Sequence, residues 1–533
     1  MKSRKVLIVG GGAAAWMTAA YLNAALNRNG RKVAEVAVIS TASAPDEVDA
    51  EATIPDINRF LAVLGVDQLQ FIRQTGGTLR QGTRFVNWLD GDGEDFYHPF
   101  DMERIGSIDR LVGTWLRSNR SVAFAETISV QPALCKMKLS PASLSRWDLG
   151  PPLPYAFHVD LAAFMAVMKD TAQRAGVTTH PDAATDVAVT GDGNIAAVLT
   201  AGGQRIEADL FVDCSGAEGL LVDKLGVGWV DQSRYLLCDR SISVGIPYEQ
   251  HYDGYVNPYT TSTALSSGWV RDIPLQDGRV LDYFYSSAHQ GDEAAQRELS
   301  DFEGAHNESP DNEVVHLRTG HRDQAWVGNC IAIGASCNVI ESPEPTNLYL
   351  VDHAASKLVE HFPLGEELEP LAFRYNRIVA NRFYEILDFA NLHFCLSRRA
   401  DTEFWKEVRQ PDRVTGRLRA KLDFWHLKRP TPSDFEDQKL PGQADQPLRP
   451  GTTPGDYRSP VDTAGLWTHE NYEAVLYGMD FLNKECDERF GRERPDPLVP
   501  RHISARVMQA QEKLPPHATW LQRMAGMPDY PKR

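Results

Sequence analysis

The glycine-rich stretch VGGGAAAW at residues 9–16 constrains the fold more than any other feature of the sequence. It follows the apolar run KVLIV at 5–9 and precedes MTAAYLNAALNR, which is rich in helix-forming residues. Gly10, Gly12 and Ala15 match the spacing G-x-G-x-x-G/A, in which glycines let the backbone turn tightly and approach a pyrophosphate at the amino end of a helix. The stretch predicts a dinucleotide-binding strand, turn and helix, with a plain glycine turn as the alternative.

Three further apolar segments predict strands. VAEVAVIS at 33–40 continues the βαβ unit, but Ser40 and Thr41 follow it where an acidic residue usually binds the ribose. Residues 187–216 predict short strands joined by the turns GDG and AGG, the last of which returns to the first sheet. GNCIAIGAS at 328–336 predicts one more buried strand.

These patterns divide the chain into four parts. Residues 1–350 are predicted to form a cofactor-binding and substrate-sheet body, and 351–428 a helical part. Residues 429–460 contain seven prolines and little apolar periodicity, which predicts a long surface loop or lid. Residues 461–533 are predicted to form a helical part that covers the substrate.

The charge balance excludes several classes of partner. The 55 Lys and Arg residues against 72 Asp and Glu give a net charge of -17, which repels nucleic acid and anionic membrane surfaces. The apolar run near the N-terminus is too short for a signal sequence or a membrane span. The seven cysteines form no CxxC pair and the 15 histidines no ligand spacing, which predicts a reducing cytoplasm and no metal site.

A resemblance to a known family extends through most of the chain. From residue 5 to about 420 the order and spacing of its motifs resemble the flavin-dependent tryptophan halogenases, with a weaker echo in LWTHENY at 466–472. The motifs are VGGGAAAW, EATIP (51–55), RFVNW (84–88), FYHPF (96–100), EADLFVDCSG (207–216), SGWVRDIP (267–274) and the strand near 330.

The resemblance implies an α/β fold of the flavin monooxygenase type: a Rossmann-like FAD-binding βαβ unit plus a mixed β-sheet, with a helical C-terminal part. It also implies a natural-product enzyme that receives FADH2 from a separate flavin reductase and reacts it with oxygen. Chloride or bromide is then oxidised to hypohalous acid, and a lysine delivers the halogen to tryptophan or an indole-like aromatic substrate. The resemblance leaves open whether the protein forms a homodimer.

The two catalytic positions implied by the resemblance are Arg80 and Glu344. Arg80 stands where the family has the halogen-carrying lysine. A guanidinium stays charged and is a poor nucleophile, so Arg80 predicts a departure from lysine-borne halogen transfer, although it can still steer an anion. The alternative is an ion-pairing arginine in a loop. Glu344 keeps the family's carboxylate, which suits a general base beside the substrate.

The cofactor side combines matches with departures. In the flavin strap, residues 47–53, the family's glycines are absent, and Arg271 replaces the second tryptophan of the W-x-W-x-I-P signature. Pro345 alters the loop that presents backbone amides to halide. These changes predict weak FAD binding, or none, and a more polar or more open flavin region. The positions implied to bind the cofactor are Gly10, Gly12, Ala13, Ala14, Ala15, Ala52, Thr346 and Asn347.

The substrate side matches the family more closely. His98 and Phe100 fall on residues that sandwich the indole, and Asp462, Trp467 and Asn471 on residues that hold the amino acid and its ring. Two functions therefore stand. The first is an FADH2- and oxygen-dependent oxidoreductase acting on an aromatic substrate. The second is a catalytically altered homologue that binds the substrate or a partner protein, with weak or no FAD binding.

Overall fold

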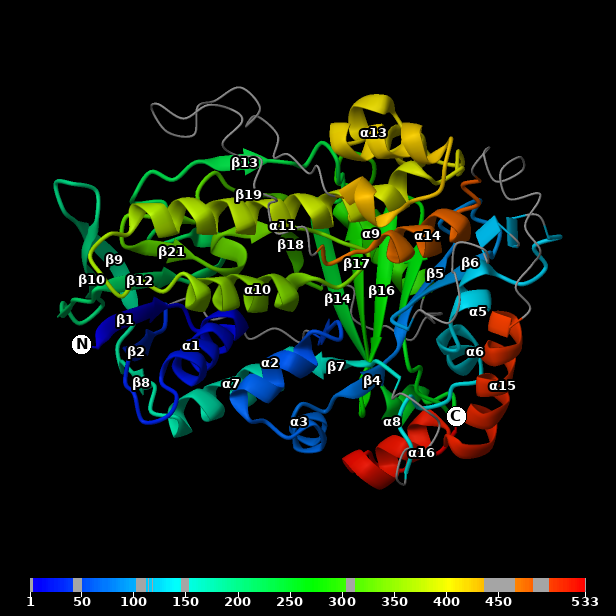
Figure 1. Cartoon of the computed structure of the whole chain (residues 1–533), viewed down its shortest axis with the longest axis horizontal. Helices are drawn as coiled ribbons and strands as arrows, with labels where there is room; N and C mark the ends of the chain where they lie inside the picture. The colour runs from blue at the N-terminus through cyan, green and yellow to red at the C-terminus, as the bar shows by residue number, and fades with distance from the viewer. Residues whose placement is uncertain are drawn as a thin grey trace.

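In a computed structural model of the chain, the described residues form five β-sheets with helices around them (Figure 1). The structure describes residues 3–41, 50–101, 112–113, 115–116, 118–144, 153–302, 312–435, 465–482 and 498–532.

The glycine-rich stretch begins a six-stranded sheet at the N-terminal end. Its strands run parallel except for β20 and β21, which pair antiparallel at one edge. Val6 on β1 pairs with Leu210 on β12, which confirms that a late strand returns to the first sheet. In spatial order the strands are β20 (Trp326–Val327), β21 (Cys330–Ala332), β12 (Leu210–Asp213), β1 (Arg4–Val9), β2 (Ala34–Ile39) and β8 (Thr178–Thr179).

A seven-stranded sheet forms the second body, and its strands are antiparallel except for β15 and β5. Of the predicted substrate residues, His98 lies on β6 of this sheet and Phe100 directly follows that strand. In spatial order it contains β18 (Val314–His316), β14 (Arg240–Pro247), β17 (Gly278–Tyr285), β16 (Gly268–Pro274), β15 (Thr260–Ala264), β5 (Gly82–Val86) and β6 (Asp95–Pro99).

Three small sheets complete the strand framework. The one that matters for the site joins β3 (Ala50–Ala52) and β4 (Thr78–Arg80) to opposite edges of β7 (Ala156–Asp160). The others are β11 (Arg205–Ile206), β10 (Ile195–Thr200) and β9 (Ala184–Val189), and β13 (Trp229–Asp231), β19 (Gly320–Arg322) and β22 (Asn338–Val339).

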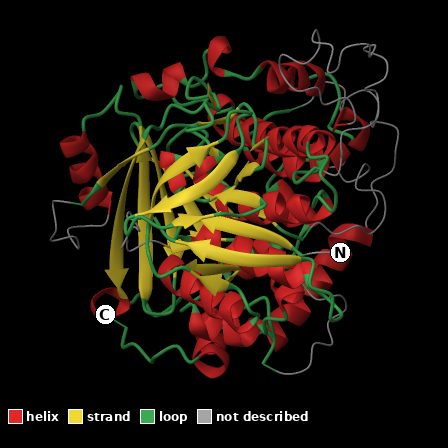
Figure 2. Ribbon diagram, turned by 90° about the vertical axis from the view of Figure 1, so that its left-hand side faces the viewer, coloured by secondary structure: helices red, strands yellow, loops and turns green. Residues whose placement is uncertain are grey.

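Helices lie around these sheets, as the second view shows (Figure 2). In the N-terminal half they are α1 (Ala13–Leu26), α2 (Ile57–Leu64), α3 (Gln68–Gln74), α5 (Phe124–Ile128), α6 (Gln131–Lys136), α7 (Leu161–Arg174), α8 (Tyr248–His251) and α9 (Asp292–Phe302). In the C-terminal half they are α10 (Asn347–Glu360), α11 (Glu369–Cys395), α12 (Glu403–Glu407), α13 (Gly416–Trp425), α14 (His469–Gly478), α15 (Leu498–Lys513) and α16 (His517–Trp520).

The helical pattern predicted at 351–395 corresponds to α10 and α11. The two helices run side by side from the six-stranded sheet towards the seven-stranded sheet (Figure 1). The predicted proline-rich loop lies outside the described residues except for 429–435, where a short 3₁₀ turn spans Pro432–Phe435. No helix in the described part of the chain combines the length and apolar character needed to cross a bilayer.

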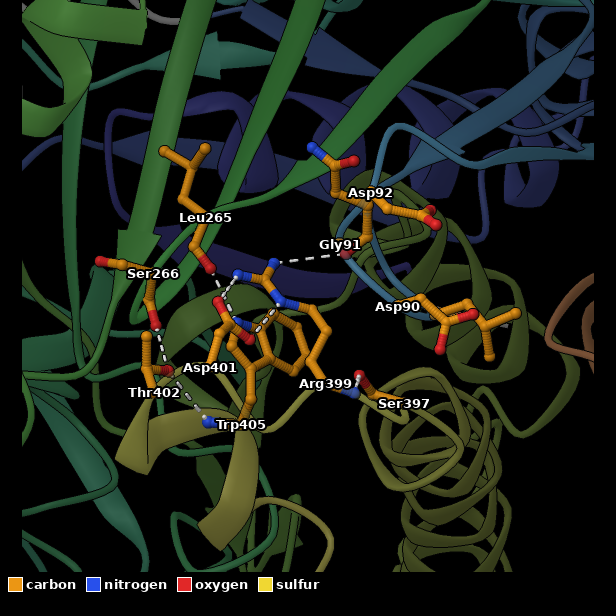
Figure 3. A network of polar contacts seen from close by, with 12 residues as sticks. Asp90, Gly91, Asp92, Leu265, Ser266, Ser397, Arg399, Asp401, Thr402 and Trp405 are labelled. Atoms are coloured by element: carbon orange, nitrogen blue, oxygen red, sulfur yellow. Dashed lines mark hydrogen bonds and ion pairs between the residues drawn. The ribbon is translucent and has the colours of Figure 1, made fainter.

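A buried arginine fixes the carboxyl end of α11 to the seven-stranded sheet (Figure 3). Arg399 donates two hydrogen bonds to the Asp401 carboxylate, at 3.0 and 2.7 Å, and one to the Asn87 carbonyl oxygen at 3.2 Å. Its guanidinium lies over the Trp405 ring, 4.6 Å from the centroid, and the Trp405 indole donates to the Leu265 carbonyl oxygen. These contacts join three loops around β5 and β15, the two parallel strands beside the candidate site.

Candidate functional site

The turn between β1 and α1 forms an open cradle. Gly10 has a φ of 143°, and a Cβ built there would lie 2.1 Å from the Cys214 carbonyl oxygen, so another residue would clash. By contrast, no described atom beyond its chain neighbours lies within 4 Å of a Cβ built on Gly12, the residue before α1. The first turn of α1 has no side-chain cap among the described residues, and the Ala15 N–H donates to the Gly12 carbonyl oxygen at 3.1 Å, which leaves the N–H groups of Ala13 and Ala14 for an anion. The cradle fits the pyrophosphate of FAD.

On the adenosine side of this cradle, the described residues directly after β2 include no carboxylate. Ser40 directly follows β2, and its hydroxyl oxygen would lie 3.2 Å from a Cβ built on Gly11. The hydroxyl thus lies beside the turn, close to where an acidic residue would reach the ribose. A neutral hydroxyl gives the ribose a weaker partner than a carboxylate does.

The flavin strap is tied to the seven-stranded sheet by Arg271. The guanidinium of Arg271 on β16 donates to Glu51 on β3 at 3.0 Å, and to Asp282 on β17 at 2.9 and 3.0 Å. Glu51 also accepts a hydrogen bond from the Asn347 amide at 3.3 Å. All of these charged side chains are buried. Of the two alternatives predicted for the flavin region, more polar or more open, these contacts agree with the polar one, because Arg271 is buried between two carboxylates, and Asp272 pairs with Arg279 at 2.8 Å.

Trp269, the remaining tryptophan of the wall signature, is fully buried and stacks on Phe284 with ring centroids 4.8 Å apart. Its indole N–H donates to Glu341. Burial raises the pKa of Glu341 to about 8, against the opposing effects of Trp269 and Arg271. Glu341 is therefore largely a neutral acid at pH 7.

The loop between Glu341 and α10 carries several buried oxygens that have no hydrogen-bond partner within the described residues. They are one carboxyl oxygen of Glu341 and the hydroxyls of Ser342 and Thr346. Thr346 precedes α10, so its hydroxyl lies at a helix amino end, where an anion is stabilised. Burying polar atoms without partners is costly, and this loop therefore fits a bound polar or anionic ligand.

Arg80 ends β4 and is completely buried, in a strand rather than the loop considered above. It donates to the hydroxyl of Thr260 and the carbonyl oxygen of Thr53, both at 2.8 Å, and to the hydroxyl of Thr83 at 2.5 Å. Its single close carboxylate is Glu344 at 3.3 Å among the described residues. Burial lowers the pKa of Arg80 to about 10, although Glu344 opposes the shift, so the guanidinium remains charged at neutral pH.

Glu344 accepts from three side chains around it. One oxygen accepts from the Thr83 hydroxyl at 2.8 Å and from Arg80, and the other lies 2.6 Å from Nδ1 of His98. Burial alone would raise the pKa of Glu344, but His98 and Arg80 outweigh burial and lower it. The structure thus brings together Arg80, Glu344 and His98, which the sequence separates by up to 264 residues.

Aromatic rings close the other side of His98. Trp467 stacks on Phe389 with centroids 4.6 Å apart, and each ring lies 5.5 Å from His98. A third ring between two others needs about 7 Å between them, since stacked atoms are separated by about 3.5 Å. His98 and Trp467 therefore contact each other directly, and an indole enters between them only if one of the two moves.

The remaining predicted substrate residues are divided. Phe100 lies beneath Arg80, with the guanidinium carbon 4.8 Å from its ring centroid, and the Asn471 amide lies 2.9 Å from His98. Asp462 lies outside the described residues.

The sequence did not predict the hydroxyls around Arg80 or His393, whose ring contacts Phe389 with centroids 5.2 Å apart. Burial lowers the pKa of His393 to about 4, and no local sequence pattern marks it.

A parallel cofactor sheet joined to a long antiparallel sheet defines an α/β fold of the flavin monooxygenase type. The sequence profile of the tryptophan halogenases matches residues 5–494. Among curated proteins, the chain is 31% identical to the tryptophan 7-halogenase RebH of Lentzea aerocolonigenes over 501 residues, 90% of each chain. It is 32% identical to the 7-chloro-L-tryptophan 6-halogenase KtzR of Kutzneria, covering 98% of this chain and all of that one.

Solved structures give the same result. The tryptophan 6-halogenase SttH of Streptomyces toxytricini has a TM-score of 0.87 at 26% identity, covering 98% of this chain and all of the other. A tryptophan halogenase of Shewanella frigidimarina has a TM-score of 0.86 at 26% identity, covering 100% and 99%. The protein belongs to the tryptophan halogenase family, whose members are flavin-dependent enzymes.

Proposed function

We propose that the protein is an FAD-dependent oxidoreductase that uses FADH2 and oxygen on tryptophan, an indole-type or another aromatic substrate, without a lysine-borne halogen. The observation that carries the proposal is Arg80, which stands at the lysine position, fully buried and paired with Glu344. Each of its three guanidinium nitrogens donates to an oxygen of the surrounding residues. A charged guanidinium held in this way orients an anion or a polar oxidant and does not act as a nucleophile.

The cradle of Gly10, Gly12 and the first turn of α1 would hold the pyrophosphate of FAD, and Ala52 would lie along the strap. When bound, the reduced flavin supplies the electrons that activate oxygen. The backbone N–H groups of Thr346 and Asn347, at the amino end of α10, would hold chloride or bromide if halide is used. A separate flavin reductase would supply the reduced cofactor, as the family membership suggests.

Glu344 would take the proton that an aromatic carbon loses on substitution. It is ionised, because the hydrogen bond from His98 and the charge of Arg80 lower its pKa, and it contacts His98, whose ring packs against Trp467. Phe100 and Trp467 would hold the ring of the substrate, and residues 461–533 would cover it. Because His98 and Trp467 are in contact, substrate binding would move Trp467 away from His98.

The experiment is a titration of the purified protein with FAD and with anaerobically reduced FAD, followed by turnover with a reductase, oxygen and each halide. Binding near micromolar and oxidation of an aromatic substrate by the wild type would support the proposal. Absence of binding in both redox states would instead favour a substrate-binding or partner protein.

The variant Arg80→Lys tests the role of the arginine. We expect chlorination or bromination to appear, or to rise at least tenfold, in Arg80→Lys. Arg84→Lys is the matched control, because Arg84 lies on the adjacent β5 in a partly exposed pair with Asp95. Equal halogenation by the wild type and Arg80→Lys would refute the assignment of Arg80.

A further inference from the structure

The side chain of Asn471 connects α14 to the buried carboxylate through His98. Its amide nitrogen Nδ2 lies 2.9 Å from Nε2 of His98, and Nδ1 of the same ring lies 2.6 Å from Glu344. The chain of contacts therefore runs from the first turn of α14 through β6 to the loop before α10. His98 and Glu344 are almost completely buried, so water does not compete for these contacts.

The capping box of α14 determines which atom of the amide faces His98. The oxygen Oδ1 of Asn471 accepts from the backbone N–H of Thr468 at 2.9 Å and from the Thr468 hydroxyl at 3.0 Å. Because Oδ1 is held by two donors, the NH2 group of Asn471 is the end directed at the imidazole. That group donates hydrogen bonds and does not accept them.

The amide orientation fixes the histidine tautomer. A donor at Nε2 requires that this nitrogen carry a lone pair, so the ring proton resides on Nδ1 and points at the Glu344 carboxylate. The opposite tautomer would place the NH2 group against an N–H and the Glu344 carboxylate against a lone pair. Both contacts would be repulsive in a buried site.

We propose that Asn471 is a positioning residue that holds His98 as the neutral Nδ1–H tautomer and thereby keeps Glu344 an ionised proton acceptor. The importance of this for turnover rests on the proposed function of Glu344. The tautomer itself follows from the contacts alone. Because Asn471 lies in the first turn of α14, these contacts also make the Glu344 carboxylate dependent on the docking of that helix.

The groups around His98 leave each ring nitrogen with one partner. Among the described residues, the titratable or charged groups near it are Glu344, Arg80 on the far side of Glu344, and His393 on α11. Burial keeps His393 neutral, with a pKa of about 4, and Arg80 already compensates the charge of Glu344. At Nε2 the partner is the Asn471 NH2 group, which is a donor and offers no acceptor for a ring N–H.

The test is nitrogen NMR of the full-length protein with 15N-labelled histidine at pH 7, with the His98 signals assigned by their loss in His98→Gln. In the wild type we expect one protonated nitrogen, Nδ1, and one unprotonated nitrogen, Nε2. In Asn471→Asp the new carboxylate can still accept from the Thr468 N–H but cannot donate. The signal of the unprotonated His98 nitrogen should then disappear, because both nitrogens become protonated.

Thr468→Ala is the matched control, because it removes one donor of the capping box and leaves the amide of Asn471 in place. Its His98 spectrum should equal that of the wild type. A wild-type proton on Nε2, or an unchanged His98 spectrum in Asn471→Asp, would overturn the proposal. If Asn471→Asp fails to fold, the wild-type tautomer alone decides. The measurement needs no flavin, so failed FAD binding would count against the proposed function and leave this result standing.

Discussion

Arg80 and Arg271 are both buried and both stand at positions where this chain departs from its family. They differ in the number of carboxylates around the guanidinium. Arg271 lies between the carboxylates of Glu51 and Asp282, with a hydrogen bond to each at about 3 Å. Arg80 has one carboxylate at 3.3 Å and is otherwise surrounded by hydroxyl and carbonyl oxygens at 2.5–2.8 Å. Both side chains are buried, so burial alone does not distinguish them.

The difference lies in what each arginine leaves available. Arg271 compensates two buried charges and connects three strands, which is the arrangement of a structural ion pair. Arg80 shares its only close carboxylate, within the described residues, with His98 and Thr83. The cluster around Arg80 thus retains a carboxylate beside the aromatic rings that can exchange a proton, whereas the cluster around Arg271 is closed. This difference supports a structural role for Arg271 and the role proposed above for Arg80.

The largest effect should follow from Arg271→Met, which leaves Glu51 and Asp282 buried without a cation. We expect the free energy of unfolding to fall by about 3–5 kcal/mol, the usual cost of leaving a buried charge unpaired. Urea unfolding followed by tryptophan fluorescence measures it. Arg84→Met is the control, since its pair with Asp95 is about one-third exposed on each side and should cost about 0–1 kcal/mol. A loss below that of the control would remove Arg271 from the structural class.

Glu341 tests whether Arg271 can stabilise a third carboxylate in its ionised form. Arg271 is occupied by two other carboxylates, and burial raises the pKa of Glu341 to about 8 from its usual value of 4.5. The folded state therefore binds the Glu341 proton more tightly than the unfolded state. Its contribution to stability is fully present below pH 4.5 and is lost as the pH rises towards 8.

Glu341→Gln should remove this part of the pH dependence. Between pH 5 and 8, ionisation of Glu341 should lower the unfolding free energy of the wild type by on the order of 2–4 kcal/mol. The variant lacks this contribution, so its unfolding free energy should fall by that much less over the same range. Denaturant unfolding at several pH values measures the difference. Parallel curves for the two proteins would mean that Arg271 holds Glu341 ionised, and that the Arg271 cluster is not saturated.

A smaller stability effect is expected for Arg80→Lys. An ammonium keeps the charge beside Glu344 but cannot reach the hydroxyls and the carbonyl oxygen in several directions at once. We expect a loss of about 1–2 kcal/mol, because one or two buried acceptors lose their partner. Thermal unfolding checks this, and a loss as large as that of Arg271→Met would mean that the two clusters are both structural.

Local patterns in the sequence predicted the parts of this molecule that form locally. The strand, glycine turn and helix at the N-terminus follow from steric and hydrogen-bonding rules that act within about 20 residues, and the structure places β1 and α1 there. The return of β12 to β1 and the long helices α10 and α11 also followed from apolar runs. The family resemblance then supplied Arg80, Glu344 and His98 as candidate residues.

Pairings between distant residues could not be predicted in this way. Arg80 meets Thr260 across 180 positions, and Asn471 meets His98 across 373. No period or motif records such contacts, because they depend on how the sheets and α14 dock. For the same reason the sequence left open whether Arg271 makes the flavin region more polar or more open, and only its buried contacts with Glu51 and Asp282 favour the polar alternative. The substrate-binding role of Asn471 stays a prediction, beside its observed contact with His98.

The smallest effect probes the neutral part of the Arg80 cluster. The Thr260 hydroxyl accepts from Arg80 and lies 3.0 Å from Nε2 of His158, whose Nδ1 lies 2.8 Å from the Thr78 hydroxyl. Thr78 donates to the Pro274 carbonyl oxygen, so it accepts from Nδ1–H of His158 and leaves Nε2 to accept from Thr260. Burial lowers the pKa of His158 well below its usual value, which agrees with this neutral ring.

Thr260→Val keeps the shape of the side chain and removes the oxygen that links Arg80 to His158. We expect a loss of about 1 kcal/mol in the free energy of unfolding, the cost of leaving buried hydrogen-bonding groups unsatisfied, without any change in the charge of the cluster. Thr261→Val, its half-buried neighbour on the same strand, should have an effect near zero. If Thr260→Val instead cost as much as Arg271→Met, Arg80 would depend on its neutral partners as strongly as Arg271 depends on its carboxylates. The contrast between the functional and the structural arginine would then fail.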